Sequence, residues 1–213
     1  MTTVITVYEL PEDATPPTAL GETHTVYRSL GAPASYRWID IGEAASTRTA
    51  ASVVAEAADR PGAEPGRYEV FHVNDQPAEL FDAGRPDESV IFVNCMRFAP
   101  DRHAEAFAAW ERVNRYMVRK PGYRWHRLHR RLGDRAPFGL VNVVEWESPD
   151  AWRAAHDEGF RALTMGDLPF SAHPTLCRPE RTQSDSAVPR DVGSIEERGA
   201  VARETATNRR AIP

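Results

Sequence analysis

The segment Phe138–Trp152, FGLVNVVEWESPDAW, contains a strand-to-helix junction that decides the fold. Its first nine residues are rich in β-branched and aromatic side chains, which predicts a short strand over Phe138–Trp146. Ser148 then supplies a helix N-cap and Pro149 a first-turn proline. We therefore expect a strand followed at once by a helix that runs to about His156.

Three elements precede this unit and one follows it. In the segment Asp101–Lys120, apolar residues recur at spacings of three and four, which places them on one stripe of a helix: Phe107, Trp110, Val113 and Met117. The predicted elements are a strand at Val90–Phe98, a helix at Asp101–Lys120 ended by Pro121-Gly122, a strand at Tyr123–Leu132 with a hairpin turn at Gly133-Asp134, and a strand at His173–Cys177. The order β-α-β-β-α-β predicts a ferredoxin-like α+β fold.

The first half of the chain carries a weaker copy of this pattern. Placed without gaps on Phe138–Trp152, the segment Tyr36–Ala50 pairs apolar residues with apolar residues and Ser46 with Ser148. Flanking strands are expected at Val4–Leu10 and Tyr68–Val73. Only 25 residues separate Leu10 from Tyr36, too few for a full helix and another strand, so we expect the first helix to be shortened or lost. The alternative is that two α+β units resemble each other because both follow the same periodicity.

The resulting organisation is two tandem copies of one fold, the first degenerate. The predicted ranges are a degenerate ferredoxin-like domain at 1–76, a linker at 77–88, a complete domain at 89–178 and a polar tail at 179–213. In the ungapped pairing, Asp40 falls opposite Asn142 and Ala44 opposite Trp146. The first copy therefore lacks the polar pair described below.

Composition and charge exclude several classes of protein. The net charge of −5 argues against a nucleic-acid partner. No apolar run is long enough to span a membrane and the N-terminus lacks a signal-peptide pattern, so a cytoplasmic location is expected. Cys95 and Cys177 show no zinc-ligand spacing, and we interpret both as buried thiols.

One strand face carries an unusual polar residue. Alternation places Phe138, Leu140, Asn142, Val144 and Trp146 on the same side of the predicted strand. A buried amide among apolar neighbours costs about 1–3 kcal/mol if it lacks hydrogen-bond partners, and the Trp146 indole adds an N–H donor. These two groups can hold a flat polycyclic ligand, or they can be satisfied within a core.

Other side chains are candidates for the same pocket. Asn94 shares a face with apolar residues on the Val90–Phe98 strand. Arg127 and His129 share a face of the next strand, where Arg127 can favour a phenolate and His129 (or His126, on the other face) can act as a base, or they can simply be solvated. The aromatic candidates, which line the pocket or pack in the core, are Trp110, Tyr116 and Trp152.

The sequence contains no nucleotide or metal motif: GxGxxG, P-loop, HExxH and GxSxG patterns are all missing. Any redox chemistry is therefore expected to use the electrons of the substrate or a diffusible reductant.

The segment Val90–Leu163 resembles the antibiotic biosynthesis monooxygenase family of dimeric α+β barrels. The resemblance lies in the motif VNCMRF, in Lys120-Pro121-Gly122-Tyr123 at the end of the helix, and in NVVEWESPDAW between Asn142 and Trp152. Asn142 stands four residues before Trp146. Anthrone monooxygenases of aromatic polyketide pathways use an asparagine and a tryptophan at this spacing.

Asn142 and Trp146 are therefore the catalytic residues that the resemblance implies, whereas Trp152 stands where those enzymes have a tyrosine. The haem-degrading relatives share Asn94, but Ala155 stands where they have a tryptophan. Their haem-ligating histidine is missing near Leu163-Thr164, so no haem is expected unless His156 or His173 replaces it.

The resemblance implies an oxygenase that uses O₂ as co-substrate on an aromatic polyketide. The reaction is oxidation of an anthrone or hydroquinone to a quinone, or oxidative cleavage of a ring carbon–carbon bond. No bound cofactor is expected, although reduced flavin (FADH₂ or FMNH₂) from a separate flavin reductase can serve. A homodimer is implied, or the first half acts as an internal partner that completes the barrel. The alternatives are a non-redox polyketide cyclase and a non-catalytic ligand-binding or dimerisation module.

Overall fold

A computed structural model describes residues 2–11, 14–21, 23–74 and 88–180. The predicted linker at 77–88 and the predicted tail at 179–213 lie outside these ranges except at their ends.

The second half contains every element expected of it, with one addition. In chain order it consists of β5 (Val90–Arg97), a 3-10 turn η1 (Pro100–Arg102), α2 (His103–Met117), β6 (Tyr123–Arg131), β7 (Leu140–Trp146), α3 (Pro149–Ala155), α4 (Glu158–Thr164) and β8 (Ser171–Pro179). Gly133 adopts a positive φ of 77° in the predicted hairpin turn. The additional element is α4, seven residues long, which the periodicity did not predict.

The first half consists of β1 (Thr2–Tyr8), β2 (His24–Ala34), β3 (Trp38–Ala44), α1 (Thr47–Ala58) and β4 (Ala63–Asn74). Between β1 and β2, the residues that the structure describes contain no helix, as expected from the short connection. The junctions after β3 and β7 are alike: Ser46 accepts a hydrogen bond from the Thr49 N–H and Ser148 accepts one from the Ala151 N–H, both at 3.1 Å.

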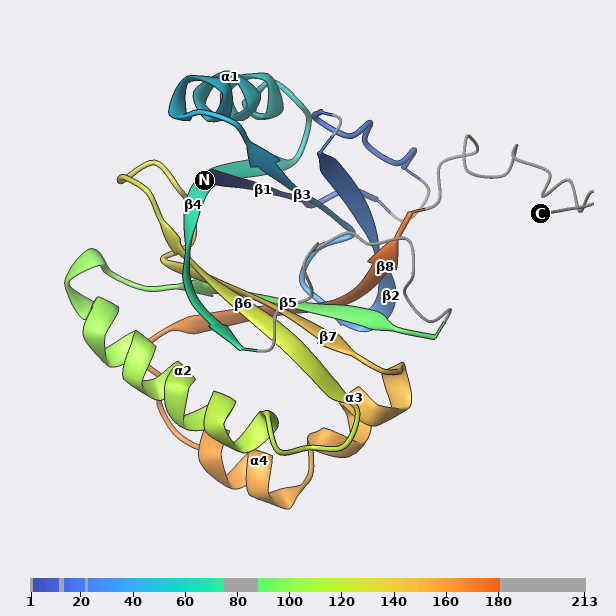
Figure 1. Ribbon diagram of the computed structural model, residues 1–213, viewed down its shortest axis with the longest axis vertical. Helices are drawn as coiled ribbons and strands as arrows, with labels where there is room; N and C mark the ends of the chain where they lie inside the picture. The colour runs from blue at the N-terminus through green and yellow to red at the C-terminus, as the bar shows by residue number, and fades with distance from the viewer. Residues whose placement is uncertain (1, 12–13, 22, 75–87, 181–213) are drawn as a thin grey trace, which may run out of the picture. The chain divides into compact units, whose positions relative to one another are not determined.

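The eight strands close into one barrel in the order β1-β3-β2-β8-β5-β7-β6-β4 (Figure 1). Each half has the same internal strand order, with the last strand beside the first, then the third, then the second. The halves meet where β4 pairs with β6 and β2 pairs with β8. The first half thus completes the barrel within one chain, as expected. Duplication as the origin of this arrangement stays a prediction.

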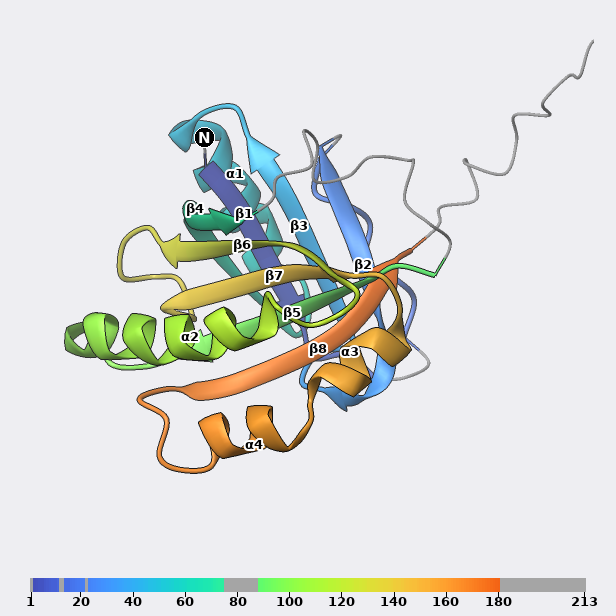
Figure 2. The ribbon, with the colours of Figure 1, turned by 60° about the horizontal axis from the view of Figure 1, so that its bottom comes forward.

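The helices cover the outer face of the barrel, with α1 over the first half and α2, α3 and α4 over the second (Figure 2). Along β7, Leu140, Val144 and Trp146 pack in clusters beneath these helices, whereas Val141 and Val143 belong to the barrel interior. This alternation confirms the predicted shared face of Leu140, Val144 and Trp146.

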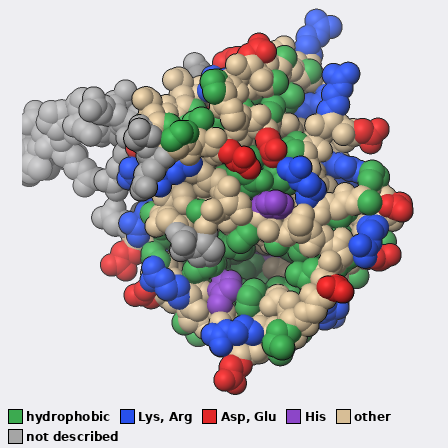
Figure 3. All heavy atoms as spheres, turned by 180° about the vertical axis from the view of Figure 1, so that it is seen from behind, with side chains coloured by type: hydrophobic (Ala, Val, Ile, Leu, Met, Phe, Trp, Pro, Cys, Tyr) green, Lys and Arg blue, Asp and Glu red, His purple; other side chains and the backbone are tan. Residues whose placement is uncertain are grey.

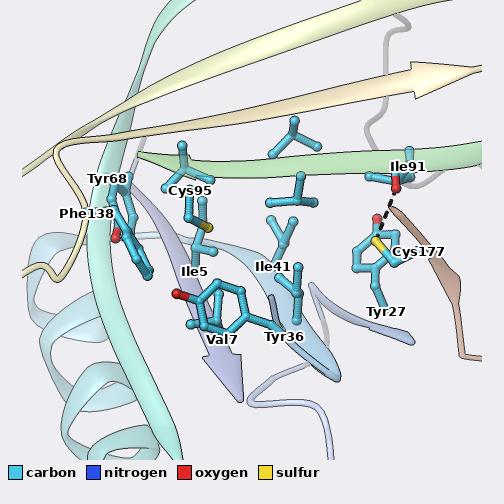
Figure 4. Close-up of a cluster of buried hydrophobic side chains, with 14 of the residues drawn as sticks. Ile5, Val7, Tyr27, Tyr36, Ile41, Tyr68, Ile91, Cys95, Phe138 and Cys177 are labelled. Carbon is cyan, nitrogen blue, oxygen red and sulfur yellow. Dashed lines mark hydrogen bonds between the residues drawn. The ribbon is translucent and has the colours of Figure 1, made fainter. Parts of the chain in front are cut away.

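The barrel interior is filled by aliphatic and aromatic side chains from both halves, among them Tyr36, Tyr68 and Cys95 (Figure 4). Cys95 and Cys177 are both free and buried, as predicted, and the Cys177 thiol donates to the Ile91 carbonyl over 3.3 Å. Phe138 also lies in this cluster, so the prediction that it shares a face with Leu140 and Trp146 is wrong. It precedes β7, which begins at Leu140, and strand alternation does not extend to it.

His129 is fully buried in the barrel interior, where its Nδ1 lies 3.3 Å from the Val141 carbonyl oxygen. Burial lowers the pKa of His129 to about 4. The hydrogen bond to Val141 raises the pKa, but its effect is smaller than that of burial. The folded protein therefore holds a neutral imidazole at a pH where the unfolded chain already binds a proton.

We expect the free energy of unfolding to fall as the pH is lowered from about 6.5, the usual histidine pKa, to about 4. A histidine whose pKa is lowered by folding changes the free energy of unfolding by about 1.4 kcal/mol per pH unit in that window. Urea unfolding across the window should give a smaller slope for His129→Asn, whose amide replaces the Nδ1 donor but does not titrate. An unchanged slope would show that His129 is protonated in the fold.

Candidate functional site

A cavity of about 340 Å³ lies between the outer face of β5, β7 and β8 and the helices α2, α3 and α4. Figure 3 shows a hollow lined by hydrophobic side chains in the half of the view where Figure 1 places these helices. The volume falls near the lower end of the range of about 300–1,000 Å³ for small-molecule sites. Five of the predicted site residues line this cavity: Asn94, Trp110, Asn142, Trp146 and Trp152.

Asn94 and Asn142 lie directly opposite each other on paired strands β5 and β7. The two Oδ1 atoms are buried, and neither has a hydrogen-bond partner among the described residues. Their neighbours on the cavity wall are mainly apolar, so these amides are available to a ligand. A core role for Asn142, the alternative interpretation of the sequence, would require the partners that it lacks.

Trp146 lies on the same face as Asn142, four residues further along β7, and its side chain is 1% exposed. The Tyr123 ring, from β6, meets the Trp146 ring edge to face, with centroids 5.2 Å apart. Tyr123 also lines the cavity, although it was not among the predicted site residues. These two aromatic side chains form part of the cavity wall.

Trp110 and Trp152 reach the cavity from helices α2 and α3. The Trp152 Nε1 is buried without a hydrogen-bond partner in the described part of the chain. Its indole therefore offers an N–H donor where the resemblance led us to expect a tyrosine hydroxyl.

His156 is a cavity residue to which the sequence assigned no catalytic role. Its Nδ1 lies 2.7 Å from the Trp152 carbonyl oxygen, and because a carbonyl only accepts, Nδ1 carries the hydrogen. Burial lowers the pKa of His156, so the ring is neutral near pH 7 and Nε2 has a free lone pair. Within the described ranges, Nε2 makes no hydrogen bond to another residue. The ring packs against Trp152 and Phe160, with centroids 4.3 Å away in each case.

The junction between α3 and α4 fixes His156 in place. Asp157 caps α4 by accepting from the Phe160 N–H, and it also accepts from Lys120 at 2.6 Å and from the Tyr116 hydroxyl at 2.5 Å. The Lys120 ammonium, with these other donors, holds the pKa of Asp157 well below its usual range. The Tyr116 hydroxyl is thus bonded to Asp157, and Tyr116 does not line the cavity. The structure places it outside the predicted pocket.

Arg127 and His129 also lie outside the cavity, on the interior face of the barrel. Arg127 lies 3.4 Å from the Glu43 carboxylate of the first half, and His129 is fully buried. Their shared face was predicted, but the sheet separates that face from Asn142 and Trp146. A direct contact with the same ligand is therefore not compatible with this arrangement.

The corresponding face of the first half is filled. Asp40, the counterpart of Asn142, is fully buried and accepts from His24 at 2.5 Å and from the Leu20 N–H at 3.1 Å. The His24 ring lies over Gly42, where a Cβ atom would come within 2.1 Å of it. A side chain of the first half therefore occupies the place that a ligand would need.

Among the described residues, no group of three or more His, Cys, Asp or Glu side chains could hold a metal ion. None of the helices in this part of the chain is long and apolar enough to cross a membrane. His173, which was considered as a haem ligand, contacts Tyr36 and Phe138 of the interior cluster rather than the cavity.

The fold and its cavity define a ferredoxin-like α+β barrel with a buried polar pair on an otherwise aromatic wall. Residues 89–159 match the model of the antibiotic biosynthesis monooxygenase family.

Several solved structures are similar to this chain. An anthrone oxidase-like protein is 17% identical with a TM-score of 0.60, covering 84% of this chain and 91% of its own. SnoaB from Streptomyces nogalater, a cofactor-independent oxygenase, is 23% identical with a TM-score of 0.38, covering 45% of this chain and 97% of its own. A ferredoxin-fold protein from Listeria monocytogenes is 10% identical with a TM-score of 0.46, covering 85% of this chain and 96% of its own. No curated protein matches the sequence.

Proposed function

We propose that the chain is an oxygenase that binds an electron-rich phenolic polycycle, such as an aromatic polyketide, and directs its reaction with O₂. The observation that carries this proposal is the pair Asn94 and Asn142, whose buried amide oxygens face an aromatic cavity without protein partners. The family of the domain at 89–159 supports the same reaction class.

The two amides suit a phenolic substrate because each offers an acceptor and two donors. The oxygen can accept from a phenol hydroxyl, and the N–H groups can donate to a phenolate or a peroxide anion as negative charge develops. Preorganised donors of this kind typically contribute about 2.7–4 kcal/mol each to transition-state stabilisation. Trp110, Trp146 and Trp152 supply flat apolar surface for the rings.

His156 is the base in this proposal. Its neutral ring keeps Nδ1–H on the Trp152 carbonyl and leaves Nε2 to take a proton from the bound phenol or from the acidic ring carbon. Tyr116, Lys120 and Asp157 hold the helix junction that carries it. Arg127 and His129 have no part in this site.

The electrons for the reaction come from the substrate. After proton loss, the substrate anion gives one electron to O₂, and the resulting radical and superoxide combine to form a carbon–oxygen bond. Protonation gives a hydroperoxide, which loses the second C–H proton as its O–O bond breaks. In sum, a ring CH₂ and O₂ give a ring C=O and water. Rearrangement of the same peroxide would cleave a ring carbon–carbon bond instead.

The test is incubation of the full chain with 1,8-dihydroxyanthrone and with an angucyclinone, with and without O₂. We expect quinone or ring-opened product at one O₂ per product in air and none under argon. Heat-denatured protein controls for autoxidation of the anthrone. Parallel reactions with a flavin reductase and NADH decide whether reduced flavin is required.

Equal product yields with and without O₂ would overturn the oxygenase proposal and favour a non-redox cyclase. Binding without any turnover in all four conditions would favour a ligand-binding module.

A further inference from the structure

Two β-bulges turn side chains from the barrel interior to the outer face, where the cavity lies. In β4, Val70 pairs with His129, but His72 pairs with Leu128, so β4 has one more residue than β6 between these pairs. Side chains alternate with a period of two, and one extra residue reverses the face of all that follow. The bulge therefore places His72 on the outer face beside Leu128.

The second bulge lies in β6. Tyr123 pairs with Trp146 and Trp125 pairs with Glu145, so β6 has an extra residue at Arg124. Trp125 remains in the barrel interior, where its indole N–H donates to the Glu145 carboxylate. Tyr123 is turned to the outer face, beside Trp146. Bulges are frequent next to active sites because they redirect single side chains in this way.

Together the bulges create a continuous hydrogen-bonded chain. The Tyr123 hydroxyl is hydrogen-bonded to His126 Nδ1, and His126 Nε2 lies 2.9 Å from His72 Nδ1. The two imidazole rings are within 11° of parallel, and the Trp110 ring contacts both at steep angles of 69° and 72°. His126 is 1% exposed, whereas His72 is only half-buried.

Each link of the chain needs one hydrogen and one lone pair. Burial, followed by the nearby His72, lowers the pKa of His126 to about 4, so its ring is neutral at pH 7 with one N–H and one free nitrogen. All the hydrogens can therefore point toward the cavity or all toward His72. Reversal of the whole chain moves one proton from end to end without any group leaving its place.

We propose that Tyr123, His126 and His72 form a proton relay between the cavity and the solvent-facing side of β4. Tyr123 is the catalytic residue of the relay, and His126 and His72 act through it. His72 belongs to the first half of the chain, so that half takes part in the chemistry of the second. The inference rests on the proposed oxygenase function.

In that reaction the relay supplies the proton for the peroxide. Tyr123 gives its hydroxyl proton to the peroxide anion formed from the substrate and O₂, His126 Nδ1–H reprotonates Tyr123, and His72 Nδ1–H reprotonates His126. His72 then takes a proton from solvent. One proton enters through His72 and one leaves through His156, so the reaction as a whole still converts CH₂ and O₂ to C=O and water.

The first arm of the test compares turnover of 1,8-dihydroxyanthrone by the wild type, His72→Ala and His103→Ala in weak buffer. Loss of a directly acting acid typically lowers a rate by about 10²–10⁴-fold. We expect His72→Ala, one step removed, to lower kcat by about tenfold and to regain it when imidazole is added. His103 lies at the start of α2 against Phe71 and outside the relay, so its variant should match the wild type. His72→Gln, a milder change, should also be slow.

The second arm needs no turnover. A pH jump is applied to the full chain with bound 1,8-dihydroxyanthraquinone, whose colour reports ionisation of its phenols. Ionisation should be slower in His72→Ala than in the wild type and should recover with imidazole, which a packing defect would not do.

The outcomes separate the two proposals. If the wild type turns over and His72→Ala is as fast in weak buffer, the relay is wrong and the oxygenase stands. If the wild type turns over nothing, the oxygenase proposal fails, and the pH jump alone decides the relay. The relay proposal is also overturned if His72→Ala is slow and added imidazole does not restore its rate.

Discussion

Asn142→Leu should abolish most turnover while leaving the protein at least as stable as the wild type. The substitution removes an amide whose buried oxygen has no partner among the described residues, and an unpaired buried polar group costs about 1–3 kcal/mol. The free energy of unfolding in urea should therefore stay the same or rise. Removing one preorganised donor should lower kcat by about 10²–10³-fold.

The opposite pattern would contradict the site assignment: a destabilised variant with normal kcat would mean that Asn142 supports the fold. Asn94→Leu should behave alike, because the two amides are opposite in the register of β5 and β7. If both hold the same oxyanion, the double variant should lose less than the product of the two single losses. Asn74→Ala, at the end of β4 and outside the cavity, controls for loss of an asparagine.

The strand face that carries Asn142 and Trp146 could be predicted because its signals are local. The strand and helix at 138–156 are set by β-branched residues, by the Ser148 cap and by Pro149, all within one segment. Alternation along each strand then placed Asn94 and Asn142 on faces that are otherwise apolar, without knowledge of the partner strand. Their roles in catalysis stay predictions.

Arg127 and His129 show where this reasoning ends. Their shared face was correctly derived from alternation, but both faces of this barrel wall are covered, one by the interior cluster and one by helices. No contrast between polar and apolar faces therefore indicates which one meets the ligand.

The histidines required long-range information. His72 meets His126 across 54 positions of sequence, through a strand pairing between the two halves and a bulge that reverses its face. No periodicity within either strand encodes that event. His156 was considered only as a haem ligand and not as a base: it ends the short helix α3, and its proposed role depends on its hydrogen bond to Trp152 and on its burial.

His156→Phe should lower kcat by about 10²–10⁴-fold, the usual effect of losing a general base. Phenylalanine keeps an aromatic ring against Trp152 and Phe160, so substrate binding should change little. In the wild type the base must be neutral, and burial lowers its pKa below the usual value of about 6.5. The rate should therefore be constant near neutral pH and should fall only at more acidic pH, as the ring takes up a proton.

Substrate acidity gives the sharpest form of this experiment. A phenol that is already ionised at the assay pH needs no base, so the loss in His156→Phe should shrink as the phenol pKa of the substrate falls. His173→Phe, which changes a histidine against the barrel interior, should lose equally little with every substrate. A deficit in His156→Phe that is the same for acidic and weakly acidic phenols would show that His156 shapes the cavity and does not move the proton.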